Sequence, residues 1–316
     1  MTEVYLNYPS YALGDHAVSI EDSVRDDRTI TDLQAFLEAG FKQHWIAAPG
    51  THAYDLAVRA VEPIKEHLSE VDTIVYSTCL TLNGNMGLWD DFLETRDVKH
   101  LLDYPVSHLQ SHFGLQQASA IGLNQQACTS VLGSIRIARG LFLAEPSLRE
   151  VLCVSADRFP EGALYEQAFN LIADGASAFV LSRKPAGFRI LSTAAITNGA
   201  LARANDEETV GTYFNYTWKV IQSALSNAGL TASALNWVVP QNTNMKAWQI
   251  LSRILGIPFD RVYAPSLSTV GHIISSDNIV NLVALEQDER LKSGDKILLC
   301  MAGYGLNWQA VIIEKV

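Results

Sequence analysis

Short apolar runs alternate along the chain with longer amphipathic segments, the pattern of a mostly parallel α/β sheet. In the first half the pattern predicts strands at 71–77, 118–126 and 149–157, a helix at 107–115 and a second helix that opens at Cys128. In the second half it predicts strands at 235–241, 261–265 and 295–303, a helix at 245–256 and a second helix after Gly271. The polar segment 83–105 is expected to be an insertion after the first strand.

The order strand, helix, strand, helix, strand therefore occurs twice, at an offset of roughly 145 residues. Any α/β chain looks self-similar at this coarseness, but the matching endings VLCVSAD and ILLCMAG favour a duplicated fold unit. Two apolar runs joined by a Pro-Ala-Gly turn place the boundary near 184–187. We expect an N-terminal half at 1–184 and a C-terminal half at 185–316.

Composition narrows the class of protein. The 316 residues are 48% hydrophobic and 18% charged, and 34 acidic against 23 basic residues leave a net charge of −11. A chain without basic clusters is a poor partner for nucleic acid or anionic membranes. We judge that no apolar run reaches the roughly 18 residues that span a bilayer, and the start MTEVYLNYPS has no secretion signal. We expect a soluble, cytoplasmic protein with no nucleic-acid or membrane partner.

The cysteine and histidine spacings predict neither a disulfide scaffold nor a metal site. The four cysteines are scattered, with no C-x-x-C pair. His108 and His112 stand at i, i+4 but lack the glutamate of a zinc motif. Cys79, Cys153 and Cys300 fall in apolar strand-like runs and are predicted to be small core residues.

Cys128 differs, because it lies where a strand ends and an apolar-periodic helix begins, in NQQACTSVLGSIRIARG. The first turn of a helix presents unpaired N–H groups and a partial positive charge, which lowers the pKa of a thiol and favours the nucleophilic thiolate. A cysteine at such a junction is also common as a buried core thiol, so position alone leaves both interpretations open.

Six segments occur in order: ACTSVLGSIRIARG, LCVSADRF, ADGASAFVL, VVPQNTN, VGHIISSDN and AGYGLNW. Together they resemble the thiolase superfamily, and most closely its β-ketoacyl-acyl-carrier-protein synthase III-like enzymes. The resemblance implies two duplicated α/β halves in a five-layer αβαβα architecture and a homodimer. It also implies that Cys128 is the nucleophile, acylated from a coenzyme A or acyl-carrier-protein thioester. No permanently bound cofactor is expected, since coenzyme A or phosphopantetheine arrives with the acyl donor.

The resemblance extends to the other catalytic groups. The family's Val-Pro-His motif has Gln241 in place of histidine, and its Gly-Asn turn has His272 in place of asparagine. An acyltransferase branch of the family carries an aspartate several residues after a Gly-His pair, which matches Asp277. The glycine-rich strand end implies an oxyanion hole made by the N–H groups of Tyr304 and Cys128. The Asp-Gly-Ala turn at Asp174 is structural in this family.

Gln241 is the main departure from the family pattern. A glutamine donates hydrogen bonds but takes no proton at neutral pH, so it cannot be a general base. Three explanations stay open: a native change with His272 as the base, a histidine deliberately replaced to stall turnover, or a non-catalytic partner or slow acyl carrier. His272 itself could instead only cap backbone groups.

The remaining predicted site residues concern substrate and partner. Substrate binding is predicted for Asn242, Asn244, Gly303 and Gly305. An acidic carrier protein needs a local basic patch on a chain of net charge −11, and Lys246 and Arg253 are spaced i, i+7 on one helix face.

The segment AGFKQHWIAAPGTHAYD lacks the family's Thr-Gly-Ile-x-x-Arg coenzyme A motif. With Asp277 present, this favours a specialised acyltransferase of secondary metabolism that passes the acyl group to an oxygen or nitrogen nucleophile of a small-molecule acceptor. The alternatives are a decarboxylating carbon–carbon condensing enzyme and a partner subunit without turnover.

Overall fold

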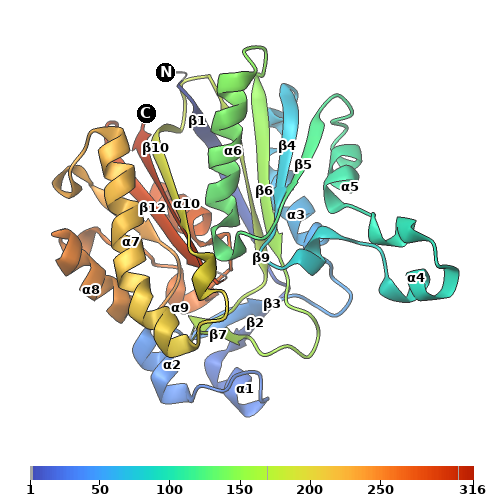
Figure 1. The fold of residues 1–316 in the computed structure, drawn as a ribbon, viewed down its shortest axis with the longest axis horizontal. Helices are drawn as coiled ribbons and strands as arrows, with labels where there is room; N and C mark the ends of the chain where they lie inside the picture. The colour runs from blue at the N-terminus through green and yellow to red at the C-terminus, as the bar shows by residue number, and fades with distance from the viewer. Residues whose placement is uncertain (1–2, 169, 305) are drawn as a thin grey trace.

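The computed structural model describes residues 3–168, 170–304 and 306–316, with only the backbone at 206, 207 and 210 (Figure 1). Nine strands form one sheet in the order β11-β12-β13-β10-β1-β9-β6-β4-β5. The strands of its first part are β1 (Tyr5–Leu13), β4 (Val71–Ser77), β5 (Ser119–Leu123), β6 (Glu150–Asp157) and β9 (Gly175–Ser182). Those of its second part are β10 (Phe188–Thr197), β11 (Trp237–Pro240), β12 (Lys296–Gly303) and β13 (Asn307–Lys315).

The two parts share one strand pattern. In the first, β4 pairs with β6 in parallel, and the antiparallel pairs β6–β9 and β9–β1 follow. In the second, β11 pairs with β12 in parallel, and the antiparallel pairs β12–β13 and β13–β10 follow. Within the sheet, the described residues of the two parts pair at two positions, between β1 and β10. The fold is therefore two similar ladders, as a duplicated thiolase-like unit requires.

Helices complete five layers (Figure 1). The helices α3 (Ala53–Val61) and α5 (Pro105–His112) cover the outer face of the first ladder. The helices α7 (Asp206–Ala228) and α8 (Met245–Leu255) cover that of the second. Between the ladders lie α6 (Ser130–Ala144) and α10 (Asp277–Gln287), in a core cluster to which both ladders contribute side chains.

The other elements are short. Near the N-terminus they are β2 (His16–Ser19), α1 (Ile20–Arg25), α2 (Leu33–Ala39) and β3 (Gln43–Ile46). Further along are α4 (Trp89–Thr95), β7 (Glu166–Gln167), β8 (Asn170–Leu171) and α9 (Leu267–Val270). The expected insertion after β4 is confirmed as an arm that carries α4 and projects beside β5 (Figure 1).

Two predicted elements differ. The expected strand at 261–265 contributes a single bridge, between Val262 and Val238, because a 3₁₀ turn occupies 259–261. The helix expected after Gly271 begins only at Asp277, which leaves 272–276 as a buried turn.

One expectation about chain hydrophobicity was wrong. The segment Ala127–Ala144 is long and apolar enough to cross a membrane by length and composition, but 61% of it is buried inside the fold. Its hydrophobicity reflects its place in the central layer, where both faces of α6 contact other elements.

Candidate active site

Cys128 lies in the 3₁₀ turn η4 (Ala127–Thr129), immediately before α6, and its side chain is buried. The chain reaches this turn through strained backbone, with left-handed φ values of 66° at Gln125 and 48° at Ala127. Ser130 at the start of α6 is hydrogen-bonded to Ser275, which precedes α10, with 2.8 Å between their Oγ atoms. The N-termini of the two central helices therefore meet beside the thiol.

His272 and Asp277 form a buried pair in the second of these segments. Nδ1 of His272 lies 2.5 Å from Oδ2 of Asp277. The carboxylate also accepts the backbone N–H groups of Asn242 and Ile273, each at 2.7 Å. Asp277 begins α10, where the helix dipole favours a negative charge. Because an ionised carboxylate only accepts, Nδ1 carries the proton and the other ring nitrogen is directed to a different partner.

That partner is Cys128, whose thiol interacts with both His272 and Cys79. The hydrogen bonds from Cys79 and His272, together with the positive charge on His272, outweigh burial and lower the pKa of Cys128 to about 5. Burial opposes protonation of His272, but the Asp277 charge and the hydrogen bonds of Asp277 and Cys128 raise its pKa to about 10. Both shifts act in the same direction and favour a thiolate beside an imidazolium over the neutral pair.

Cys79 is not the enclosed core thiol that its sequence context indicated. The strand β4 ends at Ser77, two residues earlier, so Cys79 lies on the following loop and is only partly buried. Burial raises the pKa of Cys153 and of Cys300 to about 12 each, and both are core residues as predicted.

Gln241 directly follows β11 and is 5% exposed. It lines the cavity that contains Cys128 and His272. Its Oε1 accepts the backbone N–H of Ala302 at 2.5 Å. The donor is a backbone amide, so the oxygen must face it, and the side-chain NH₂ is left free for a bound group.

Asn242 does not reach the cavity. Its Nδ2 donates to Ser266 and to the Gly271 carbonyl, and its Oδ1 accepts from Asn281. The predicted substrate contact has no support in this geometry, because these bonds instead hold the turn that carries His272. Asn244 does line the cavity and caps the N-terminus of α8.

The predicted oxyanion-hole segment lies against the nucleophile. A Cβ at Gly303 would come within 2.9 Å of the backbone nitrogen of Cys128, so only glycine permits this approach. Tyr304 lines the cavity and is partly exposed. Gly305 lies outside the described residues, and its role stays a prediction.

The cavity that contains Cys128 and His272 has a volume of about 430 Å³. Its apolar wall consists of Phe214, Ala247, Ile250, Leu306 and Trp308. Lys246 stands at this cavity and forms an ion pair with Glu38 at 3.0 Å. Arg253 is exposed two turns further along α8. Such a wall suits an acyl chain or other apolar group.

Asp174 has a structural environment, as expected. Its carboxylate accepts the N–H groups of Ala47 and Phe159 and the hydroxyl of Tyr165, each at 2.8 Å. Burial raises its pKa above the usual value.

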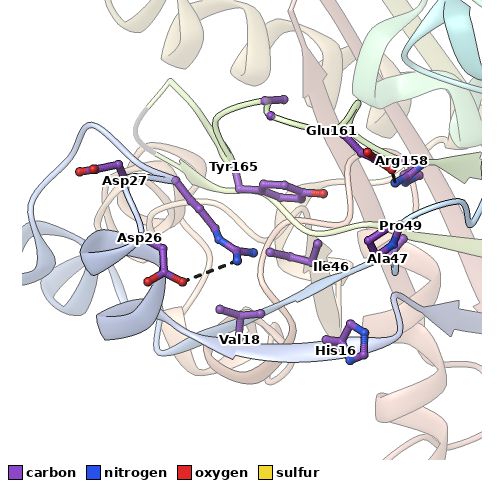
Figure 2. Close-up of a pocket in the computed structure, with 13 residues that line it drawn as sticks. His16, Val18, Asp26, Asp27, Ile46, Ala47, Pro49, Arg158, Glu161 and Tyr165 are labelled. Carbon is purple, nitrogen blue, oxygen red and sulfur yellow. Dashed lines mark hydrogen bonds and ion pairs between the residues drawn. The ribbon is translucent and has the colours of Figure 1, made fainter.

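A second cavity of about 520 Å³ shares no lining residue with the first (Figure 2). Four of its charged groups form two ion pairs: Arg28 lies 3.6 Å from Asp26, and Arg158 lies 3.2 Å from Glu161. Figure 2 shows Asp26, Arg158 and Glu161 in this cavity, together with Tyr165 and with Val18 and Ile46 of the β2–β3 pair. Its described lining contains no serine, threonine, cysteine or lysine.

Comparison with known proteins identifies the family to which the chain belongs. Residues 124–199 match the family model for 3-oxoacyl-[acyl-carrier-protein] synthase III, and residues 225–315 match the model of its C-terminal part. The β-ketoacyl-[acyl-carrier-protein] synthase III of Chlamydia caviae is 24% identical over 310 residues, which is 88% of this chain and 87% of that protein. That of Deinococcus deserti is 25% identical, covering 86% and 80%.

Solved structures agree on the fold. The Thermus thermophilus synthase III superposes with a TM-score of 0.83 at 20% identity, covering 99% of both chains. ChlB3, an acyltransferase, gives 0.83 at 19% identity, covering 99% of this chain and 98% of its own. The chain belongs to the thiolase superfamily, and within it to the β-ketoacyl-[acyl-carrier-protein] synthase III family. It is an enzyme of acyl transfer or condensation.

Proposed function

We propose that this enzyme is an acyltransferase: Cys128 takes an acyl group from a carrier-protein or coenzyme A thioester and passes it to a hydroxyl or amine of a small-molecule acceptor in secondary metabolism. The observation that carries the proposal is the chain of contacts from Asp277 through His272 to Cys128, with an amide at position 241. This supports the first explanation of Gln241, in which His272 is the base and Gln241 is native.

In the first step the Cys128 thiolate attacks the carbonyl carbon of the donor thioester. Backbone N–H groups near Gly303 and the NH₂ of Gln241 would hold the developing oxyanion, which the close approach of Gly303 to Cys128 and the orientation of Gln241 support. The donor carbon–sulfur bond then breaks, and the leaving thiol takes the proton of the His272 imidazolium. The products are acyl-Cys128, free thiol and neutral His272.

In the second step neutral His272 removes the proton of the acceptor hydroxyl or amine as that atom attacks acyl-Cys128. The bond between the acyl carbon and the cysteine sulfur breaks, and the thiolate and imidazolium return. Asp277 keeps Nδ1 protonated, so the ring presents its other nitrogen as the base. One histidine thus serves both steps.

Decarboxylating condensation is the second candidate. It needs hydrogen-bond donors around a malonyl carbonyl rather than a base for an O–H or N–H. The imidazolium and the Gln241 amide could supply two such donors, so the test must separate the reactions by their products. Release of carbon dioxide from a malonyl donor would indicate condensation.

A carrier protein is the acyl donor that the surface supports best. Lys246, Ile250, Arg253 and Ile254 form an exposed basic and apolar stripe along α8, and Ile250 also lines the cavity. Carrier proteins are acidic, so this stripe offers charge complementarity at the cavity mouth. Glu38 neutralises part of the Lys246 charge through an ion pair. A docking carrier protein must therefore compete with Glu38 for Lys246.

We also propose a homodimer formed through β5, which ends the sheet with one edge unpaired among the described residues. The arm beside it exposes a set of large apolar side chains: Leu82, Leu88, Trp89, Leu93, Val98, Leu102 and Tyr104. Exposed apolar area of this kind marks an interface. Sedimentation velocity should give a dimer, and a monomer at micromolar concentration would exclude it.

The acyl-enzyme is the species to measure. Incubation with acyl thioesters should add the acyl mass to the peptide containing Cys128, and Cys128→Ala should show no increase. A hydroxyl or amine acceptor should then remove the added mass without release of carbon dioxide. A protein that never gains mass from any donor would support the non-catalytic partner instead.

A further inference from the structure

A second thiol lies beside the nucleophile that lines the acyl cavity. The side chain of Cys79 packs against the core cluster to which Cys128 belongs, and each of the two thiols shifts the pKa of the other. The acyl-transfer steps above leave Cys79 without a chemical role. It is partly exposed, whereas Cys153 and Cys300 are fully enclosed.

A buried carboxylate fixes the loop that presents Cys79. Asp157 accepts the backbone N–H of Cys79 at 2.8 Å, that of Leu80 at 3.1 Å and the hydroxyl of Thr78 at 2.7 Å. The hydroxyl of Ser275 lies 3.3 Å from Asp157 and 3.4 Å from the carbonyl of Ala127, the residue before Cys128. The same network therefore holds both cysteine segments, and the approach of the two sulfurs is built into the fold.

The two sulfurs differ in charge. The hydrogen bonds from Cys79 and His272 lower the pKa of Cys128, which keeps it as thiolate. Cys79 donates to that thiolate, and this contact together with burial raises its own pKa, which keeps it as thiol. An attacking thiolate beside a protonated second thiol is the arrangement of a redox-active cysteine pair.

We propose that Cys79 and Cys128 form a reversible disulfide when a hydroperoxide enters the cavity. The Cys128 thiolate attacks the peroxide, the O–O bond breaks, and the products are Cys128 sulfenic acid and hydroxide or alkoxide. The sulfur of Cys79 then attacks the sulfenic sulfur, the S–O bond breaks, and the hydroxyl leaves as water with the Cys79 proton. For the disulfide to form, the distance between the two sulfur atoms must shorten to about 2.05 Å.

This modification has two consequences. The disulfide consumes the Cys128 thiolate that takes the acyl group from the donor, so the enzyme is inactive until a thiol reductant restores it. It also keeps Cys128 from the irreversible sulfinic state. Neither consequence depends on the acyl group or its acceptor, so a failure here is distinct from a failure of the proposed acyltransferase function.

The experiment treats the full-length protein with hydrogen peroxide at neutral pH and analyses non-reduced peptides by mass spectrometry. We expect a cross-linked pair of peptides containing Cys79 and Cys128, loss of iodoacetamide labelling at both after denaturation, and recovery of both with dithiothreitol. Cys153 and Cys300 in the same digest are internal controls and should stay unmodified thiols.

Cys79→Ser is the matched variant, since it keeps a small donor and removes the second sulfur. After peroxide its Cys128 should be trapped as sulfenic acid by dimedone and then pass to sulfinic acid, with labelling that dithiothreitol no longer restores. The proposal is overturned if Cys128 of the parent protein reaches sulfinic acid as fast as in the variant. Circular dichroism melting checks that the variant is folded, and Cys79→Ala repeats the comparison if it is not.

Discussion

The imidazole Nδ1 of His272 lies 2.5 Å from a carboxylate oxygen of Asp277, and both side chains are buried. They are five positions apart in the chain, and the turn 272–276 folds back so that the first residue of α10 meets the ring. The carboxylate also holds two backbone N–H groups, so its position is fixed from three sides. The pair is therefore preorganised to set the tautomer and raise the pKa of His272.

Asp277→Asn should lower the rate of the transfer step by about 10²-fold, the usual loss when a general base is misplaced. The charge of Asp277 raises the pKa of His272, and only neutral His272 takes a proton. The acid limb of the pH–rate profile for transfer should therefore move to lower pH in the variant, even as the plateau falls. Single-turnover decay of purified acyl-Cys128 across pH measures both, and an unmoved acid limb would argue against His272 as the base.

The Cys128 thiolate should persist well below the ordinary thiol range. Contacts with Cys79 and His272 depress its pKa, so the iodoacetamide rate should stay high from pH 8 down to about pH 6 and fall as pH drops through the depressed pKa. His272→Gln removes the positive partner and should move the midpoint toward the usual value of about 8.5. Cys79→Ser in the same assay shows how much of the shift Cys79 supplies; a midpoint near 8.5 in the parent protein contradicts the ion pair.

Gln241→His should bring no gain in acyl transfer. The Gln241 oxygen is used by the N–H of Ala302, and a histidine in its place would bring a second imidazole to a site where His272 already carries a proton. Gln241→Ala should slow acylation about tenfold, the effect of one lost hydrogen bond to the reacting carbonyl. Asn244→Ala is the control, because Asn244 lines the same cavity but caps α8. A tenfold or greater gain in Gln241→His would instead show that a catalytic histidine had been replaced.

The architecture could be predicted because a buried α/β chain records its layers as apolar runs. Both faces of β6 and β9 are covered, so every residue of each is buried and the strands read as continuous apolar or small-residue stretches. The strand expected at 261–265 did not form, because its apolar run is too short for a ladder and makes only a bridge at Val262. Local pattern indicates burial, and only the tertiary fold decides which buried segments pair.

The site could be predicted in part. Cys128 lies in the turn immediately before one central helix and Asp277 begins the other, and the sequence motifs indicated each residue. The contact between Cys79 and Cys128 joins segments 49 positions apart. The spacing of apolar residues does not predict this contact, although both residues follow strands whose carboxyl ends lie at the same edge of the sheet. The partnership of His272 with Cys128 likewise depends on a turn whose length the helix pattern misjudged.

Charge reversal on α8 should separate carrier-protein docking from chemistry. Lys246→Glu and Arg253→Glu, made singly, should each weaken acylation by an acyl carrier protein several-fold and more at low salt, because exposed charges act through long-range attraction. Acylation by a free thioester mimic should be unchanged, since neither side chain contacts Cys128. Lys65→Glu gives the same change in net charge on the opposite outer layer, beside α3, and should leave both donors unaffected. Lys246→Glu should have the larger effect, because the new carboxylate also repels Glu38 at the cavity mouth. Equal loss with both donors would place the effect in the cavity and refute the docking stripe.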